Sequence, residues 1–154
     1  MGGTFDHLHN GHKLLLTQAL LCSDQKIVCG ITTDALLKKK AYAEFIESFS
    51  IRKENVIKFC KRINPKIYEG ERPRLQIVEL ADPIGPTGTD PELEALILTR
   101  EVEKGGKMIN DMRISNGLQL LELIYADMII SEFKVEDHLM QSQFSNKTSS
   151  TYIR

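Results

Sequence analysis

The sequence predicts an α/β fold, a doubly wound, Rossmann-like parallel sheet with helices on both faces. Three observations support this fold class. The chain has 154 residues, which suits one domain over residues 1–154 with a sizeable core. Short, β-branched apolar segments alternate with longer segments of helical periodicity. No repeat or linker interrupts this order, which is typical of parallel strands joined by crossover helices.

In the first half of the chain, two longer helices flank a strand and a short helix. Residues 12–23 have a broad apolar face and are predicted to form a helix. Residues 26–32 are nearly all apolar and predict a buried strand. The Thr-Asp pair that opens 33–40 is a cap signal for a short helix. Residues 50–63 begin with a capping serine and predict a helix that ends before Pro65.

In the second half, a loop separates further strands. Residues 75–80 are predicted to form a strand, and 81–91 hold three prolines and two glycines, so they predict a loop. Residues 93–99 predict a strand that follows a turn of helix.

The remaining segments continue the same alternation. We expect the pair Gly105–Gly106 to break the chain, and a helix to resume over 107–118. A last strand is expected within 121–130, and the "TSST" of 131–154 could cap a final helix. In such sheets, ligands bind beyond the carboxyl ends of the strands.

Composition disfavours several classes of protein. The net charge is −1, with 20 basic and 21 acidic side chains, so a nucleic-acid footprint is not indicated. No apolar run approaches the roughly 20 residues of a membrane span, and Lys13 interrupts what would be a signal peptide. Cys22, Cys29 and Cys60 have no CxxC spacing, which disfavours zinc and disulfides. We expect a cytoplasmic protein without nucleic-acid or membrane partners.

The opening "MGGTFDHLHNGHKLLL" predicts a phosphate-binding turn. Gly2 and Gly3 let the backbone approach a ligand closely. The helix that follows starts near Gly11 or His12, and its unpaired N–H groups and dipole favour an anion. His9 and His12 lie three residues apart, so both can face the same side. Two imidazoles there can stabilise negative charge that develops in a transition state.

Simpler interpretations compete for several of these residues. His7 is more simply explained as a solvated loop residue. A zinc site is a poor fit because Asp6 is the one additional ligand at a suitable spacing. The run 38–40 is equally explained as a solvated helix end. Arg113 is at least as easily a surface residue as a ligand, and the loop 81–91 can be a proline-stiffened connection.

Two motifs at opposite ends of the chain resemble the HxGH nucleotidyltransferase superfamily. "GGTFDHLHNGH" resembles its first motif, with residues 9–12 as HxGH, and "SSTYIR" resembles its second, ISSTxxR. Thr148 stands where that motif usually has isoleucine. With "LLKKK", "DPIGPTGTDP" and "GGKMIN", the whole chain resembles eukaryotic-type phosphopantetheine adenylyltransferase, a family also found as one domain of the bifunctional coenzyme A synthase.

The resemblance implies a reaction and a set of residues. In this family 4′-phosphopantetheine and MgATP give dephospho-coenzyme A and pyrophosphate, so Mg²⁺ enters with ATP and no protein metal site is expected. His12 would stabilise the pentavalent α-phosphate, His9 would contact the nucleotide phosphates, and Thr4 would hold the acceptor phosphate or orient the metal. The superfamily's phosphate-binding arginine corresponds loosely to Arg113. The implied catalytic residues are His12, His9 and Lys40; ATP would bind Gly3, His9, Gly11, His12, Ser149, Ser150, Thr151 and Arg154, and the acceptor Thr4, Lys38 and Lys40.

The chain also departs from the family pattern. The family has an apolar strand before "GGTFD", whereas Met1 alone precedes Gly2, so we expect a truncated first strand at the centre of the sheet. Its helix also continues beyond the second motif, while this chain stops at Arg154. Two alternatives stay open: a nucleotidyltransferase with nicotinamide mononucleotide or choline phosphate as acceptor, and an inactive nucleotide-binding module. Assembly into a homo-oligomer or a larger coenzyme A synthesis complex also stays open.

Overall fold

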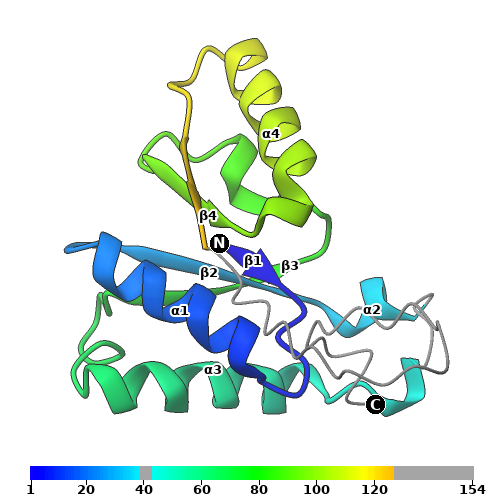
Figure 1. The fold of residues 1–154 in the computed structure, drawn as a ribbon, viewed down its shortest axis with the longest axis vertical. Helices are drawn as coiled ribbons and strands as arrows, with labels where there is room; N and C mark the ends of the chain where they lie inside the picture. Colours follow the sequence, from blue (N-terminus) through cyan, green and yellow to red (C-terminus); the bar gives the residue numbers. More distant parts are fainter. Residues whose placement is uncertain (39–42, 127–154) are drawn as a thin grey trace, which may run out of the picture.

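The computed structural model describes residues 1–38 and 43–126, and within them five parallel strands form two sheets (Figure 1). The larger sheet has the order β1-β2-β3 and the smaller sheet pairs β4 with β5. The strands are β1 (Gly2–Gly3), β2 (Ile27–Thr32), β3 (Leu75–Leu80), β4 (Ala95–Leu98) and β5 (Glu122–Tyr125). All pairings are parallel, so the predicted α/β class is confirmed.

Helices connect the strands as the apolar periodicity predicts. They are α1 (Asn10–Cys22), α2 (Asp34–Leu37), α3 (Phe49–Ile63) and α4 (Glu103–Ser115), with short 3-10 turns at Ala43–Phe45, Gly85–Gly88 and Arg100–Val102. In Figure 1, α1 and α3 lie side by side along the β1-β2-β3 sheet, and α4 lies at the other end of the molecule with β4. Among the described residues, no helix has the length and apolar character to cross a bilayer.

The main core lies between α1, α3 and the larger sheet. Alternate residues of β2 point into it, because successive side chains of a strand face opposite sides. Helices α1 and α3 contribute apolar side chains that recur at helical spacing along one face of each helix. Its buried members include Leu15, Leu16, Ala19, Ile27, Cys29, Ile31, Val56, Cys60 and Leu75.

Strand β4 is covered on both faces, which is the doubly wound arrangement. Ile97 belongs to the main core with α1, whereas Leu96 and Leu98 form a second cluster with Ile109 of α4. Neighbouring residues of one strand thus face helices on opposite sides of the sheet. Helices on both faces are therefore present at β4.

Two local predictions in this half are wrong. The Gly105–Gly106 pair does not break the chain, because α4 begins at Glu103 and runs through both glycines. A Cβ on Gly106 would lie 3.1 Å from Leu98 Cδ1, so the glycine lets the helix lie directly on β4. The residues directly before 93 are also not helical; the Asp90 carboxylate instead accepts a hydrogen bond from the Glu92 N–H, which forms a turn.

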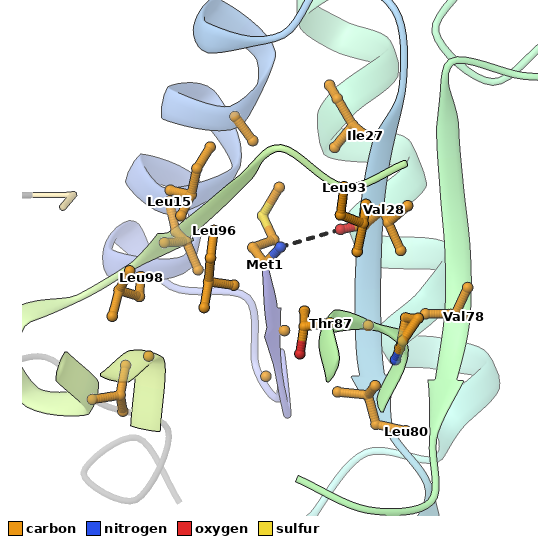
Figure 2. Close-up of a pocket in the computed structure, with 18 of the residues that line it drawn as sticks. Met1, Leu15, Ile27, Val28, Val78, Leu80, Thr87, Leu93, Leu96 and Leu98 are labelled. Atoms are coloured by element: carbon orange, nitrogen blue, oxygen red, sulfur yellow. Dashed lines mark hydrogen bonds between the residues drawn. The ribbon is translucent and has the colours of Figure 1, made fainter. Parts of the chain in front are cut away.

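Strand β1 is short and lies between β2 and β4 (Figure 2). Its ladder to β2 extends back to Met1, whose carbonyl accepts from Gly30 N at 3.0 Å and whose amino group donates to Val28 O at 3.2 Å. Burial lowers the pKa of that amino group. Within the described residues no ladder joins β1 to β4, and the two sheets stay separate. In the described residues β1 has two residues and is the edge strand of the larger sheet, so the expected place at the centre of one sheet is wrong here.

Candidate functional site

The turn between β1 and α1 has an unusual backbone. Phe5 and His7 have φ values of 54° and 42°, in the left-handed region that residues other than glycine seldom adopt. Their neighbours hold this conformation. The Asp6 carboxylate accepts from Glu47 N at 2.8 Å, and His7 N donates to the Glu47 carboxylate at 2.7 Å, while the Phe5 ring is fully buried. Such local strain is found most often at functional sites.

His9 begins helix α1. It is the N-cap, and its Nδ1 accepts a hydrogen bond from Gly11 N at 3.2 Å. The predicted phosphate-binding N–H of Gly11 is therefore engaged by the His9 ring in this structure. A phosphate that takes this N–H has to displace the ring, and the displaced imidazole would then lie beside the anion.

His12 lies in the first turn of α1 and is packed between two rings. Its ring stacks on His9 with centroids 3.8 Å apart, and it lies 5.2 Å from the Phe5 ring. Burial, followed by the nearby His9, lowers the pKa of His12 to about 4, although Asp6 opposes the shift. His12 is therefore neutral at pH 7. Its Nδ1 is buried and has no hydrogen-bond partner in the described part of the chain, which leaves this atom available to a ligand.

These residues line a cavity of about 950 Å³. Gly3, Thr4, His9, Gly11 and His12 form one wall at the carboxyl end of β1. The apolar part lies around Met1 and β4, where leucine side chains gather (Figure 2). The volume falls within the range of about 300–1,000 Å³ for small-molecule sites. The cavity thus combines an apolar interior with polar groups at a helix N-terminus.

Part of the loop 81–91 also lines the cavity, and hydrogen bonds within the loop fix its shape. Asp82 accepts hydrogen bonds from Ile84 N and Gly85 N, which lower the pKa of its carboxyl group. Gly85 has φ +52, a conformation suited to glycine. Pro86 and Thr87 follow in a 3-10 turn, and both line the cavity.

The structure gathers some of the predicted site residues and leaves others untested. Gly3, Thr4, His9, Gly11 and His12 lie together around the main cavity. Lys38 follows α2 and lines a separate, smaller cavity of about 280 Å³. Lys40, Ser149, Ser150, Thr151 and Arg154 lie outside the described residues.

Arg113 is neither a surface residue nor a phosphate ligand. It is fully buried, and its guanidinium donates to the carbonyl oxygens of Thr87, Asp90, Leu93 and Gln119 at 2.6–3.2 Å. Both expectations for this residue are wrong for one reason: main-chain carbonyls of the neighbouring loops already occupy its donors. It anchors the loop 81–91 to α4.

Sequence reasoning missed a second buried arginine, Arg52. It lies on the buried stripe of α3 with Val56 and Cys60, at four-residue intervals. A charged residue in an apolar stripe is the signal that could have identified it, because buried arginines need partners.

A cluster of Asp6, His7 and Glu47 brings potential metal ligands within 4.8 Å of one another. Their hydrogen bonds explain the cluster without a metal. Asp6 accepts from Glu47 N, the Glu47 carboxylate accepts from His7 N, and the His7 ring contacts Phe45 O at 3.2 Å. These contacts shape the turn, and we assign no metal to them.

The geometry defines a class of protein: a parallel α/β domain with an HxGH turn at a helix N-terminus beside a nucleotide-sized cavity. The sequence pattern of the cytidylyltransferase-like family matches residues 1–154. The chain belongs to this family of nucleotidyltransferases.

Individual relatives narrow the similarity. The chain is 38% identical over 154 residues to a Saccharomyces cerevisiae protein named phosphopantetheine adenylyltransferase, and spans 46% of that relative. An uncharacterized Schizosaccharomyces pombe protein is 36% identical, again with 46% of its length covered. A Pyrobaculum aerophilum protein named phosphopantetheine adenylyltransferase is 36% identical over 155 residues, with 87% covered. The chain thus spans about half the length of each of the two yeast relatives.

A solved structure supports the fold. A protein of unknown function from Archaeoglobus fulgidus superposes with a TM-score of 0.66 and 26% sequence identity. The match covers 84% of this chain and 97% of that one.

Proposed function

We propose that the chain transfers the adenylyl group of ATP to 4′-phosphopantetheine and forms dephospho-coenzyme A and pyrophosphate. One observation carries the proposal: His9 and His12 stack at the N-terminus of α1, and His12 has a buried, unpartnered nitrogen beside the cavity. The helix terminus suits a phosphate, and the ring suits a group on which charge develops. The names of the matching relatives support this choice of substrates.

The reaction needs positioning and charge stabilisation more than proton transfer. An oxygen of the acceptor phosphate forms a bond to the α-phosphorus of ATP, and the bond from that phosphorus to pyrophosphate breaks. The acceptor phosphate is ionised at neutral pH, so no general base is required. Catalysis then depends on in-line placement and on donors directed at the α-phosphate oxygens.

The described residues divide between these tasks. His12 is neutral, and a neutral imidazole carries one N–H that can donate to an α-phosphate oxygen. His9 and Gly11 bind the nucleotide phosphates once the His9 cap opens. Gly3 and Thr4 line the same wall; in this proposal Gly3 permits close approach and Thr4 holds the acceptor phosphate.

Other roles rest on the motifs alone. In this proposal Lys40 binds the acceptor phosphate, with Lys38, which lines the smaller cavity, as the second choice. The C-terminal motif binds the β- and γ-phosphates through Ser149, Ser150, Thr151 and Arg154. Mg²⁺ arrives with ATP and supplies charge neutralisation at the phosphates.

The test is pyrophosphate release by the purified intact protein. ATP and, separately, CTP are paired with 4′-phosphopantetheine, nicotinamide mononucleotide or choline phosphate. We expect release with ATP and 4′-phosphopantetheine, and dephospho-coenzyme A as the second product by mass spectrometry.

Other outcomes would replace the proposal. Faster turnover with another acceptor, or with CTP, would assign the site to a different transfer within the same family. Nucleotide binding without release from any pair would identify an inactive binding module.

A further inference from the structure

Arg52 joins four segments, two of which line the cavity at Thr4 and Thr32. Its side chain is fully buried. Nη1 donates to Thr4 O at 2.7 Å and to Thr32 O at 2.9 Å, which ties the carboxyl ends of β1 and β2 together. Nε donates to Glu47 O at 2.8 Å, and Nη2 to the Asp34 carboxylate at 2.6 Å.

These bonds bracket the strained turn from both sides. Thr4 immediately precedes Phe5, and its carbonyl is held directly by Arg52. Glu47, also held by Arg52, binds Asp6 through its N–H and His7 N through its carboxylate. The two left-handed residues thus lie between contacts that share one guanidinium.

The position of His12 depends on this turn. The Phe5 ring is buried and packs against the His12 ring, so a shift of Phe5 changes what covers His12. Asp6, the carboxylate that acts on His12, is held by Glu47. Arg52 itself touches neither histidine in the contacts described above.

We infer that Arg52 is a positioning residue: it holds the Thr4–His9 turn, and through Phe5 and Asp6 the His12 ring, in the geometry that adenylyl transfer requires. The expected effect of Arg52 on kcat rests on the proposed function. Its expected effect on the position of the His12 ring rests on the structure alone. A guanidinium is suited to this role because its planar fork reaches several acceptors at fixed angles. Lysine keeps the charge but not the fork.

The first test is the NMR titration of the His12 ring in Arg52→Lys. In the wild-type protein we expect the His12 pKa near 4, because its neighbours exclude water from the ring. Loosening the turn should raise the pKa of His12 toward its ordinary value of about 6.5. This readout requires no catalytic activity.

Arg113→Lys is the matched control. Arg113 is as buried as Arg52 and also makes four hydrogen bonds, but it holds the loop 81–91 and residues 93 and 119 rather than the turn. We expect Arg113→Lys to lower the melting temperature about as much as Arg52→Lys does, while the pKa of His12 stays as in the wild type. An equal shift of the His12 pKa in both variants would mean general loosening and would overturn the inference.

The second test is kinetic. Arg52→Lys should lower kcat by about 10-fold or more, because small misplacements of reacting groups can cost up to about 100-fold. The same substitution in a His12→Ala background should cost much less, since the ring that Arg52 positions is gone. Fully additive effects would contradict the inference.

The two proposals fail in different ways. Absence of transfer by the wild-type protein removes the proposed function, and the His12 titration then decides the inference alone. Transfer by Arg52→Lys at the wild-type rate, with an unchanged titration, overturns the inference and leaves the function intact. If Arg52→Lys does not fold, Asp34→Ala replaces it, because that side chain is 59% exposed. A smaller shift in the same direction is expected there, and no shift overturns the inference.

Discussion

Arg52 and Arg113 show two uses of the same buried side chain. Each is fully buried and makes four hydrogen bonds that join segments distant in the sequence. Arg52 has a carboxylate partner, Asp34, whereas every acceptor of Arg113 is a main-chain carbonyl. Arg52 supports a strained turn that leads into the two histidines of the site. Arg113 supports a proline-rich loop that contains no histidine.

The difference indicates how the two halves of the site share their tasks. The half formed by β1, β2 and α1 holds polar groups in one geometry beside the predicted phosphates. The half formed by β4 and α4 supplies an apolar wall through Leu96 and Leu98. Chemistry should therefore be sensitive to changes in the first half, and stability to changes in both.

The largest expected effect on stability is from Arg113→Met. Methionine fills much of the volume but removes the donors that the carbonyls of Thr87, Asp90, Leu93 and Gln119 share. We expect a loss of about 3–5 kcal/mol in the free energy of unfolding, because each hydrogen bond to a charged group contributes about 1.5–3 kcal/mol and water can replace part of the four that are lost. Urea denaturation measures it. A loss below about 1 kcal/mol would show that the loop 81–91 rearranges to satisfy its own carbonyls.

His12→Ala should have the largest effect on rate. Removing one donor that acts on developing charge lowers kcat by about 10²–10³, or about 2.7–4 kcal/mol. ATP affinity, measured by calorimetry, should change little, because the contact strengthens in the transition state.

His7→Ala is the control for this prediction, since the backbone N–H of residue 7 still reaches Glu47 after the substitution. We expect it to lower kcat far less than His12→Ala. If His12→Ala instead raised the KM for ATP and left kcat within a few-fold of the wild type, His12 would be a ground-state binding residue.

The pH dependence of stability should also arise in the first half. The pKa of His12 is about 4 in the folded protein and 6.5 in its ordinary state. Between these values the unfolded chain binds more protons than the folded chain, so stability falls as pH falls through this window. The contribution is on the order of 2 kcal/mol, after a discount for the partial exposure of the ring.

Unfolding by urea at pH 7 and at pH 4.5 tests this prediction. The wild-type protein should lose more stability between the two pH values than His12→Gln, which has no titrating ring. Equal losses would place the titration on other groups.

Local features of the structure were predictable from the sequence, and long-range ones were not. The strand over 75–80 and the helix over 50–63 follow from apolar periodicity, a property of neighbouring residues, although the capping role predicted for Ser50 is wrong because the N-cap is Ser48. The HxGH turn was found because its residues are contiguous. Arg52 was missed because its acceptors Thr4 and Thr32 lie 48 and 20 residues away and are main-chain atoms, which leave no pattern in the side chains.

The site shows the same limit. Spacing placed His9 and His12 on one side of the helix, and their rings do stack. The engagement of Gly11 N by His9 and the burial of His12 depend on the turn geometry and on Phe5, so they required the structure. The error at Gly105–Gly106 has a similar cause, because packing on β4 outweighs the weak helix propensity of glycine.

That error leads to the smallest prediction, which compares two adjacent glycines of α4. A Cβ on Gly105 meets nothing within 4 Å, so Gly105→Ala should stabilise the protein by about 0.5–1 kcal/mol through helix propensity. A Cβ on Gly106 would lie 3.1 Å from Leu98 Cδ1 and 3.3 Å from Leu123 Cδ2. Gly106→Ala should therefore not show this stabilisation, because the new methyl group forces α4 to move away from β4 or the leucines to shift. Melting temperatures of the two variants, measured side by side, provide the comparison. Equal stabilisation by both would show that the contact between α4 and β4 is loose enough to accept a methyl group, and the close packing assigned to this half would be wrong.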